Sequence, residues 1–214
     1  MKDVMNELRN SGAIIPDGTW LERFLPGLLS SETAAQTAKA AIHDNEYCEV
    51  LSPIFVMAVL YADTRFPRSG AASALREVWL KYGISGDVEY TSKIFHDLRR
   101  ASQNSLMSLD EIIEFENLPS EVTIYRGQLF SDGKRAATGM SWTLDEQVAQ
   151  WYAAPVPHQR QPHGWVLSAT VPKRAVLAMF LERGEREVVV DTRQITKMTA
   201  KRGTADHFPE HLMK

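Results

Sequence analysis

The chain has 214 residues, of which 44% are hydrophobic and 24% are charged, a composition typical of a globular domain with a substantial core. Its formal net charge of −3 argues against a protein that coats nucleic acid without specificity. The single cysteine, Cys48, excludes an internal disulfide and most cysteine metal sites, and we expect it to be a small core residue.

Charge is distributed unevenly along the chain. Residues 1–117 carry 11 Lys and Arg against 17 Asp and Glu, giving −6, whereas residues 118–214 carry 13 against 10, giving +3. A mildly electropositive C-terminal part suits a phosphate-bearing ligand, although so small an excess identifies none.

The sequence predicts no membrane partner and a cytoplasmic location, in the producing cell or in an infected host. The longest apolar run, residues 53–62, is about half of the roughly 20 residues that span a bilayer, and Asp63 ends it. The first ten residues carry mixed charge and lack the apolar stretch of a secretory signal. Export without a cleaved signal would leave no mark in the sequence.

Residues 1–117 predict helices. The alanine-rich segment 34–42 is helix-prone, and Ser108 stands three residues before Glu111 in a capping-box pattern, in a helix that Pro119 would end. Gly83 stands where another helix would stop, and that helix has one apolar stripe at 3–4 residue spacing. The stripe consists of Leu75, Val78, Trp79 and Tyr82.

After Pro119 the pattern changes to short β-branched or alternating runs, which predict strands at 121–127, 164–172, 175–181 and 186–191. One further helix is expected directly behind residue 143. Thr143 and Glu146 have capping-box spacing there, and an apolar stripe follows, formed by Leu144, Val148, Trp151 and Tyr152.

Three short motifs stand in order on these predicted strands or strand ends: Arg126 in "IYRG", Ser141 and Thr143 in "SWT", and Glu185 and Glu187 in "ERE". Together they resemble the Arg, Ser-x-Ser/Thr, Glu-x-Glu signature of the ADP-ribosyltransferase family, in the branch of binary toxins, vertebrate ecto-enzymes and certain phage enzymes. The chain departs from the pattern in its bulky Trp142, in threonine as the third residue of the serine motif, and in a short loop before Glu185.

The resemblance covers residues 118–214 and implies a fold. We expect an α+β protein in which a small split antiparallel sheet surrounds a central NAD cleft, with the helical portion, residues 1–117, preceding that core or packed on it. The sequence has neither a GxGxxG nor a phosphate-loop motif, so NAD binding here would not be Rossmann-like.

The resemblance also implies a reaction, the transfer of one ADP-ribosyl group from NAD to an arginine of a target protein, without metal. Breaking the nicotinamide–ribose bond leaves positive charge on the sugar, which an ionised carboxylate, assigned to Glu187, would stabilise. By resemblance Glu187 also holds a ribose hydroxyl, with Ser141 orienting it and Thr143 beside them. Arg126 offers a fork for the pyrophosphate, and Gly127 leaves room for it. Glu185 marks arginine as the acceptor.

Each motif has another interpretation on its own. Glu185 and Glu187 could belong to a solvated turn after Gly184, Arg126 could cap a strand, and a Ser-x-Thr before a helix is often only a cap. At the level of function, the alternatives are an NAD glycohydrolase and a catalytically silent module that binds a protein or nucleic acid. The sequence leaves open the protein target and the biological role: phage takeover, toxin or effector, defence or regulation.

No metal site is expected. His207 and His211 are four residues apart, but Pro209 between them breaks a helix. His158 and His163 stand in a proline-rich loop, where they would line an entrance or face water. The basic run at 197–202 is interpreted as a solvated strand face rather than a nucleic-acid contact.

Overall fold

The computed structural model describes residues 19–43, 53–83, 87–128, 139–154 and 164–204, without the side chains of 19–22, 53–56 and 59. The chain forms two compact units, one from residues 1–84 and 97–106 and the other from 85–96 and 107–214. Cys48 and the four histidines considered as metal ligands lie outside the described residues, so the expectations about them stay predictions.

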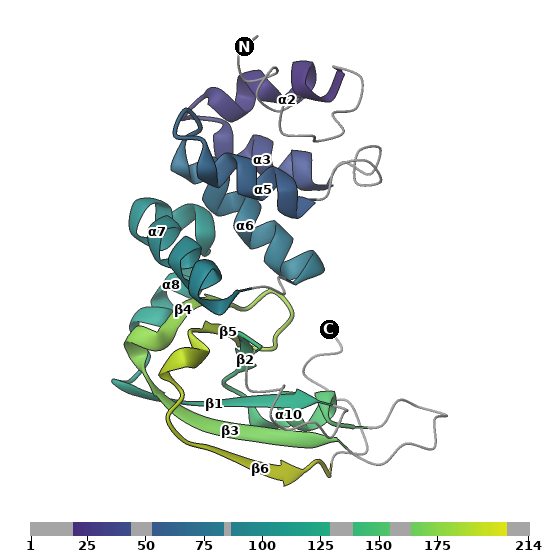
Figure 1. The fold of residues 1–214 in the computed structure, drawn as a ribbon, viewed down its shortest axis with the longest axis vertical. Coiled ribbons are helices and arrows are strands. Elements are labelled where there is room, and N and C mark those ends of the chain that lie inside the picture. The colour runs from purple at the N-terminus through teal and green to yellow at the C-terminus, as the bar shows by residue number, and fades with distance from the viewer. Residues whose placement is uncertain (1–18, 44–52, 84–86, 129–138, 155–163, 205–214) are drawn as a thin grey trace. The chain divides into compact units, whose positions relative to one another are not determined.

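The first unit is helical, as the sequence predicts. It contains α2 (Thr19–Leu29), α3 (Ala34–His43), α5 (Pro53–Ala62) and α6 (Arg68–Tyr82), together with the last part of α7 (Val88–Leu106). α3 and α5 pack on α6, and α2 packs on α3 (Figure 1). α7 is kinked at Ser102, whose φ of −158° and ψ of 60° are not helical.

Helix α6 shows how the apolar stripe becomes core. Leu75, Val78 and Trp79 are buried, and the helix ends where expected, because Gly83 adopts φ 65° and donates its N–H to the carbonyl of Trp79. Tyr82, the last member of the predicted stripe, stands on the final turn of the helix and is 43% exposed.

A buried carboxylate joins two helices of this unit. Glu77 on α6 is 6% exposed, and its two oxygens meet Lys39 Nζ at 3.1 Å and His43 Nε2 at 2.5 Å, both on α3. Burial acts to raise the pKa of Glu77, but the hydrogen bonds from His43 and Lys39 outweigh it, so that the pKa lies below its usual value. Lys39 and His43 thus supply the hydrogen-bonding partners that the buried carboxylate of Glu77 requires.

The second unit is built on one antiparallel sheet of six strands in the order β4-β5-β2-β1-β3-β6. Its elements are α8 (Leu109–Glu116), β1 (Glu121–Gln128), β2 (Ser141–Thr143), α10 (Glu146–Tyr152), β3 (Trp165–Pro172), β4 (Val176–Phe180), β5 (Glu187–Val190) and β6 (Met198–Arg202). Two 3₁₀ turns, Lys173–Ala175 and Thr192–Gln194, follow β3 and β5. The α+β class and the predicted strands are therefore confirmed.

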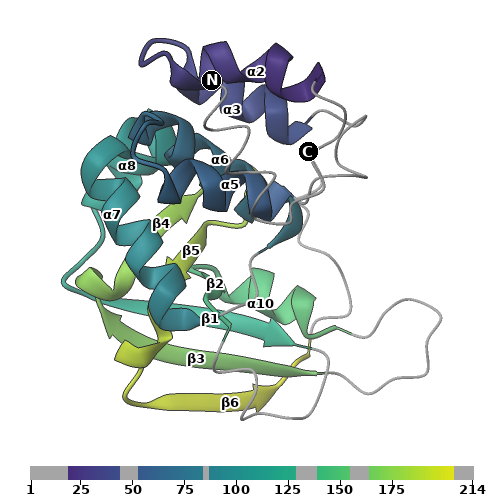
Figure 2. The same ribbon diagram turned by 45° about the horizontal axis from the view of Figure 1, so that its top comes forward.

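The two central strands of the sheet, β1 and β2, are paired over the shortest length. β1 and β3 pair along their whole length, from Glu121 with Pro172 to Gln128 with Trp165, whereas β1 and β2 share one register pair, Tyr125 with Thr143. The strands β1, β3 and β6 consequently run side by side as one group, and β4, β5 and β2 form another (Figures 1 and 2). We call this junction between β1 and β2 the seam.

The core of this unit lies around β4 and β5. All five residues of β4 are buried, as are Val188, Val189 and Val190 of β5, and α8 packs on β4. The predicted capping box of α8 is present: Ser108 Oγ accepts from the N–H of Glu111, whose carboxylate accepts from the N–H of Ser108.

The second predicted capping box is wrong. Helix α10 begins at Glu146 and is capped by Asp145, whose carboxylate accepts from the N–H of Gln147 at 2.7 Å. Thr143 cannot be the cap because it is still part of β2, where it pairs with Glu187 of β5. Because of this strand pairing, α10 begins two residues later than the sequence predicts.

Helix α8 lies within residues 1–117, which the sequence predicts to be helical, but it belongs to the second unit and packs on its sheet.

The basic run at 197–202 contains β6, a strand at the edge of the sheet whose residues from Thr199 to Arg202 are exposed, as expected for a solvated face. Within the described part of the chain, no helix has the length and apolar character needed to cross a membrane.

We expect Glu77→Gln to lower the free energy of unfolding by about 1–3 kcal/mol, because an amide cannot replace both charge-assisted contacts of a buried carboxylate. Since the folded-state pKa of Glu77 is depressed, its contribution is present above the unfolded value near 4.5 and is lost as pH falls through the folded pKa. Urea unfolding of the full chain at pH 7 and pH 3 measures both effects. Glu32→Gln, at an exposed carboxylate on the same unit, is the control.

Candidate functional site

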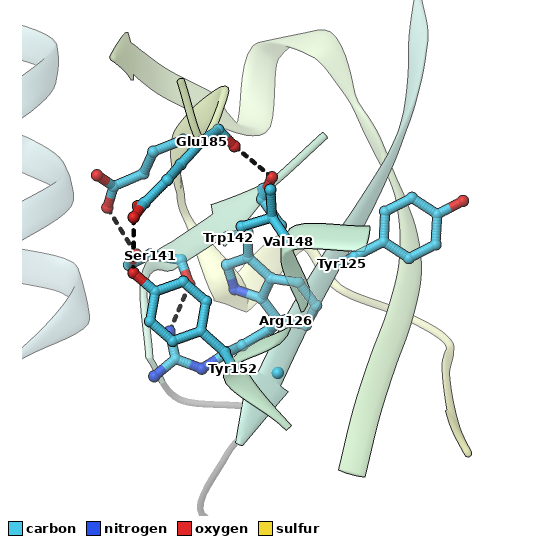
Figure 3. A pocket seen from close by; sticks show the side chains of 10 residues that line it. Tyr125, Arg126, Ser141, Trp142, Val148, Tyr152 and Glu185 are labelled. Atoms are coloured by element: carbon cyan, nitrogen blue, oxygen red, sulfur yellow. Dashed lines mark hydrogen bonds between the residues drawn. The ribbon is translucent and has the colours of Figure 1, made fainter. Parts of the chain in front are cut away.

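A pocket of about 210 Å³ opens in the second unit beside the seam of the sheet. β1, β2, α10 and the turn entering β5 all contribute to it. Figure 3 shows the lining side chains, which belong to Tyr125, Arg126, Gly127, Ser141, Trp142, Thr143, Val148, Tyr152, Glu185 and Glu187. All six residues that the sequence singles out for a site therefore line one cavity.

The serine and the second glutamate of the motifs are in direct contact. Ser141 Oγ donates a hydrogen bond of 2.6 Å to Glu187 Oε1. Strand pairing produces this contact, because β2 and β5 are antiparallel neighbours whose register sets Ser141 opposite Val189 and Thr143 opposite Glu187. Residues 46 positions apart in the sequence are thereby fixed at one edge of the pocket.

The two glutamates reach the pocket by a route other than strand alternation. β5 starts only at Glu187, and Arg186 before it has φ 45°, which is unusual for a residue other than glycine. Gly184, with φ 66°, closes the preceding turn. The left-handed residue between the glutamates lets both line the pocket, while the Arg186 side chain leaves it and donates to Glu114 Oε2 at 3.1 Å.

Arg126 on β1 also lines the pocket. Its Nη1 donates to the carbonyl oxygen of Ser141, and its Nε is buried without a hydrogen-bond partner in the part of the chain that is described. Burial lowers the pKa of the guanidinium, while the negative charge of Glu187 acts in the opposite direction. An arginine stays charged despite such a shift, so the pocket holds a fixed cation with an unused donor near two carboxylates.

Glycines surround this guanidinium and the adjacent backbone. A Cβ on Gly139 would lie 2.6 Å from Arg126 Cζ, so the absence of a side chain there makes space for the guanidinium. A Cβ on Gly127 would lie 1.9 Å from the carbonyl oxygen of Ala149 on α10. Gly127 therefore serves the close packing of α10 on β1, and it also lines the pocket, where the sequence suggests that it leaves room for a ligand.

Thr143 acts on the turn that carries the glutamates. Its side chain is buried, and its Oγ1 donates to the carbonyl oxygen of Glu185 at 2.5 Å. Thr143 Oγ1 also accepts from the N–H of Asp145 at 2.9 Å. The N–H of Leu144 also donates to the carbonyl oxygen of Arg186 at 3.2 Å. The end of β2 thus fixes the backbone at Glu185 and Arg186.

Helix α8 holds the same turn from another side. Glu111, 1% exposed, accepts from the N–H of Leu181 at 2.9 Å where β4 ends, and Glu114, one turn along α8, pairs with Arg186. We call the segment from Leu181 to Arg186 the glutamate turn. Its first and last residues are both bonded to one face of α8.

Sequence reasoning missed Tyr152 as a site residue and assigned it to the apolar stripe of α10. Its hydroxyl donates to Glu185 Oε1 at 2.9 Å, and the side chain is 40% exposed. The signal that could have identified it is its position at the end of the helix, beyond the buried Val148 and Ala149. Figure 3 shows its side chain beside Glu185, whereas the ring of Tyr125 points away from them.

This arrangement favours a ligand with both an anionic part and a developing cation. The guanidinium of Arg126 can bind phosphate oxygens, and the paired carboxylates can stabilise positive charge that forms beside them. Within the described residues there is no cluster of three or more His, Cys, Asp or Glu side chains that could hold a metal ion.

Comparisons with protein-family models, with curated proteins and with solved structures found no match to this chain.

The two glycines allow a stability test. We expect Gly127→Ala to destabilise the protein by about 2 kcal/mol or more, because its Cβ would collide with helix backbone that cannot easily shift. Gly139→Ala should change stability by less than about 1 kcal/mol, since its Cβ meets the far end of the Arg126 side chain rather than backbone. Urea unfolding of both variants measures the difference, and the opposite ranking would contradict the packing described.

Glu111 and Glu114 of α8 allow a second stability test. Glu111→Gln should cost about 1–3 kcal/mol, because an amide offers one acceptor where Ser108 N–H and Leu181 N–H need two. Glu114→Gln breaks only a half-exposed ion pair and should cost less than about 1 kcal/mol. Thermal unfolding of the variants gives both values, and equal costs would mean that Glu111 does not anchor the turn.

Proposed function

We propose that the protein is an NAD-dependent mono-ADP-ribosyltransferase that modifies arginine side chains of a target protein. The hydrogen bond between Ser141 and Glu187, in a pocket shared with Arg126 and Glu185, is the observation that carries this proposal. An antiparallel sheet that narrows at the β1–β2 seam is compatible with the split sheet expected of such an enzyme.

Glu187 would stabilise the transition state. As the bond between nicotinamide N1 and ribose C1′ breaks, its electron pair passes to the ring, neutral nicotinamide leaves and positive charge develops on the sugar. A carboxylate about 4 Å from that charge, at an effective dielectric near 20, contributes on the order of 4 kcal/mol. Because Ser141 holds one carboxylate oxygen, Glu187 is oriented before the charge appears.

Arg126 would bind the pyrophosphate. Its buried Nε lacks a partner within the described residues and is the kind of unsatisfied donor that a phosphate oxygen would satisfy. The cavity of about 210 Å³ is smaller than the roughly 300–1,000 Å³ of typical ligand pockets, so it would hold the ribose and adjoining groups rather than the whole dinucleotide.

Glu185 would act on the acceptor. An arginine guanidinium that approaches C1′ carries positive charge and must lose a proton when its nitrogen bonds to carbon. A second carboxylate on the glutamate turn, lining the same pocket as Glu187, could both pair with the guanidinium and accept that proton.

We expect Glu187→Gln to reduce nicotinamide release from NAD by at least about a hundredfold while NAD binding persists, because an amide cannot stabilise the sugar cation. Glu185→Gln should abolish release that depends on agmatine, a small guanidine acceptor, and spare acceptor-independent hydrolysis. Chromatography of nicotinamide with and without agmatine measures both, and NAD-induced shifts in melting temperature report binding.

Glu121→Gln, at an exposed carboxylate on β1 outside the pocket, is the matched control and should behave as wild type. Nicotinamide release by the wild-type protein that agmatine does not increase would replace transferase by NAD glycohydrolase. Absence of both release and NAD binding would remove the enzymatic proposal and favour a binding module.

A further inference from the structure

Tyr152 on α10 lines the pocket, and the reaction above gives it no role. Its hydroxyl donates to Glu185 Oε1 at 2.9 Å, and its ring packs edge-on against Trp151 with centroids 4.5 Å apart. Among the described residues, this phenol is the one hydrogen-bond partner of the Glu185 carboxylate, because Thr143 bonds the backbone carbonyl of Glu185 instead.

The two pocket glutamates are thus held in the same manner. Ser141 donates to one oxygen of Glu187, and Tyr152 donates to one oxygen of Glu185. The hydrogen bond to Oε1 orients the Glu185 carboxylate and, among the described residues, leaves its other oxygen available to a ligand. The two donors come from different elements, β2 and α10, so each glutamate is oriented independently of the other.

We propose that Tyr152 is the positioning residue for the acceptor: its hydroxyl fixes Glu185 so that the second carboxylate oxygen meets an incoming guanidinium, and its exposed ring lines the acceptor's entrance. This inference rests on the proposed transferase function. It adds a specificity element, because a flat cation such as guanidinium can also lie against an aromatic face.

The electrostatics at Tyr152 are consistent with a phenol that stays protonated. Burial raises its pKa, and the hydrogen bond to Glu185 together with the negative charge of Glu185 and Glu187 raises it further, while Arg183 acts in the opposite direction. The phenol therefore donates to Glu185 across the whole neutral range.

We expect Tyr152→Phe, which removes the hydroxyl and keeps the ring, to lower kcat/KM for agmatine about tenfold, the loss of one hydrogen bond to a charged group. Nicotinamide release without acceptor should stay within about twofold of wild type. Tyr152→Ala should lower kcat/KM for agmatine further and raise its KM. Tyr90→Phe, at an exposed tyrosine outside the pocket, is the matched control.

A spectroscopic titration tests the contact without any reaction. Absorbance at 295 nm follows ionisation of the six tyrosines, and the phenol with the highest titration midpoint should vanish in Tyr152→Phe. In Glu185→Gln this midpoint should fall toward 10. An unchanged midpoint in Glu185→Gln would overturn the proposed link between Tyr152 and Glu185.

The outcomes separate the two proposals. If wild-type protein transfers ADP-ribose to agmatine and Tyr152→Phe does so equally well, the role of Tyr152 is wrong and the transferase stands. If Tyr152→Phe lowers acceptor-dependent and acceptor-independent release to the same degree, Tyr152 is only structural and the inference fails. If wild-type protein shows no transfer, both proposals fail.

Discussion

The pairing of β2 with β5 is the constraint on which the site depends. β2 is only three residues long, yet it lies between β1 and β5 and sets Thr143 opposite Glu187. This register brings the hydroxyl of Ser141 to the carboxylate of Glu187, and it forces Thr143 to stay extended rather than cap α10. A shift of one residue would turn the hydroxyl and the carboxylate to opposite faces of the sheet.

The glutamate turn contains an unfavourable backbone conformation that neighbouring elements stabilise. Arg186 adopts a left-handed conformation that costs free energy for a residue with a Cβ, and such conformations persist only where neighbouring structure imposes them. Here β2 bonds the turn through Thr143 and Leu144, and α8 bonds it through Glu111 and Glu114. The result is a pair of carboxylates on one pocket, held by elements that are distant in the sequence.

Periodicity and motif spacing predicted much of this fold and its site. The strands, the helix ending at Gly83 and the capping box at Ser108 were predictable because they depend on local pattern. The start of α10 and the close contact of Gly127 with α10 were not, because both are decided by partners elsewhere in the fold, the strand β5 and the backbone of Ala149. Tyr152 was assigned to the core since a helical stripe does not reveal which of its members lies at an opening.

The seam of the sheet has a consequence for how a ligand would affect the protein. Arg126 belongs to the strand group β1, β3 and β6, whereas Ser141 and Glu187 belong to the group β4, β5 and β2. Few backbone bonds join the groups, since β1 and β2 share one register pair. A ligand that contacts Arg126 together with Ser141 or Glu187 would bridge the two strand groups, so its binding would stabilise the whole sheet against unfolding.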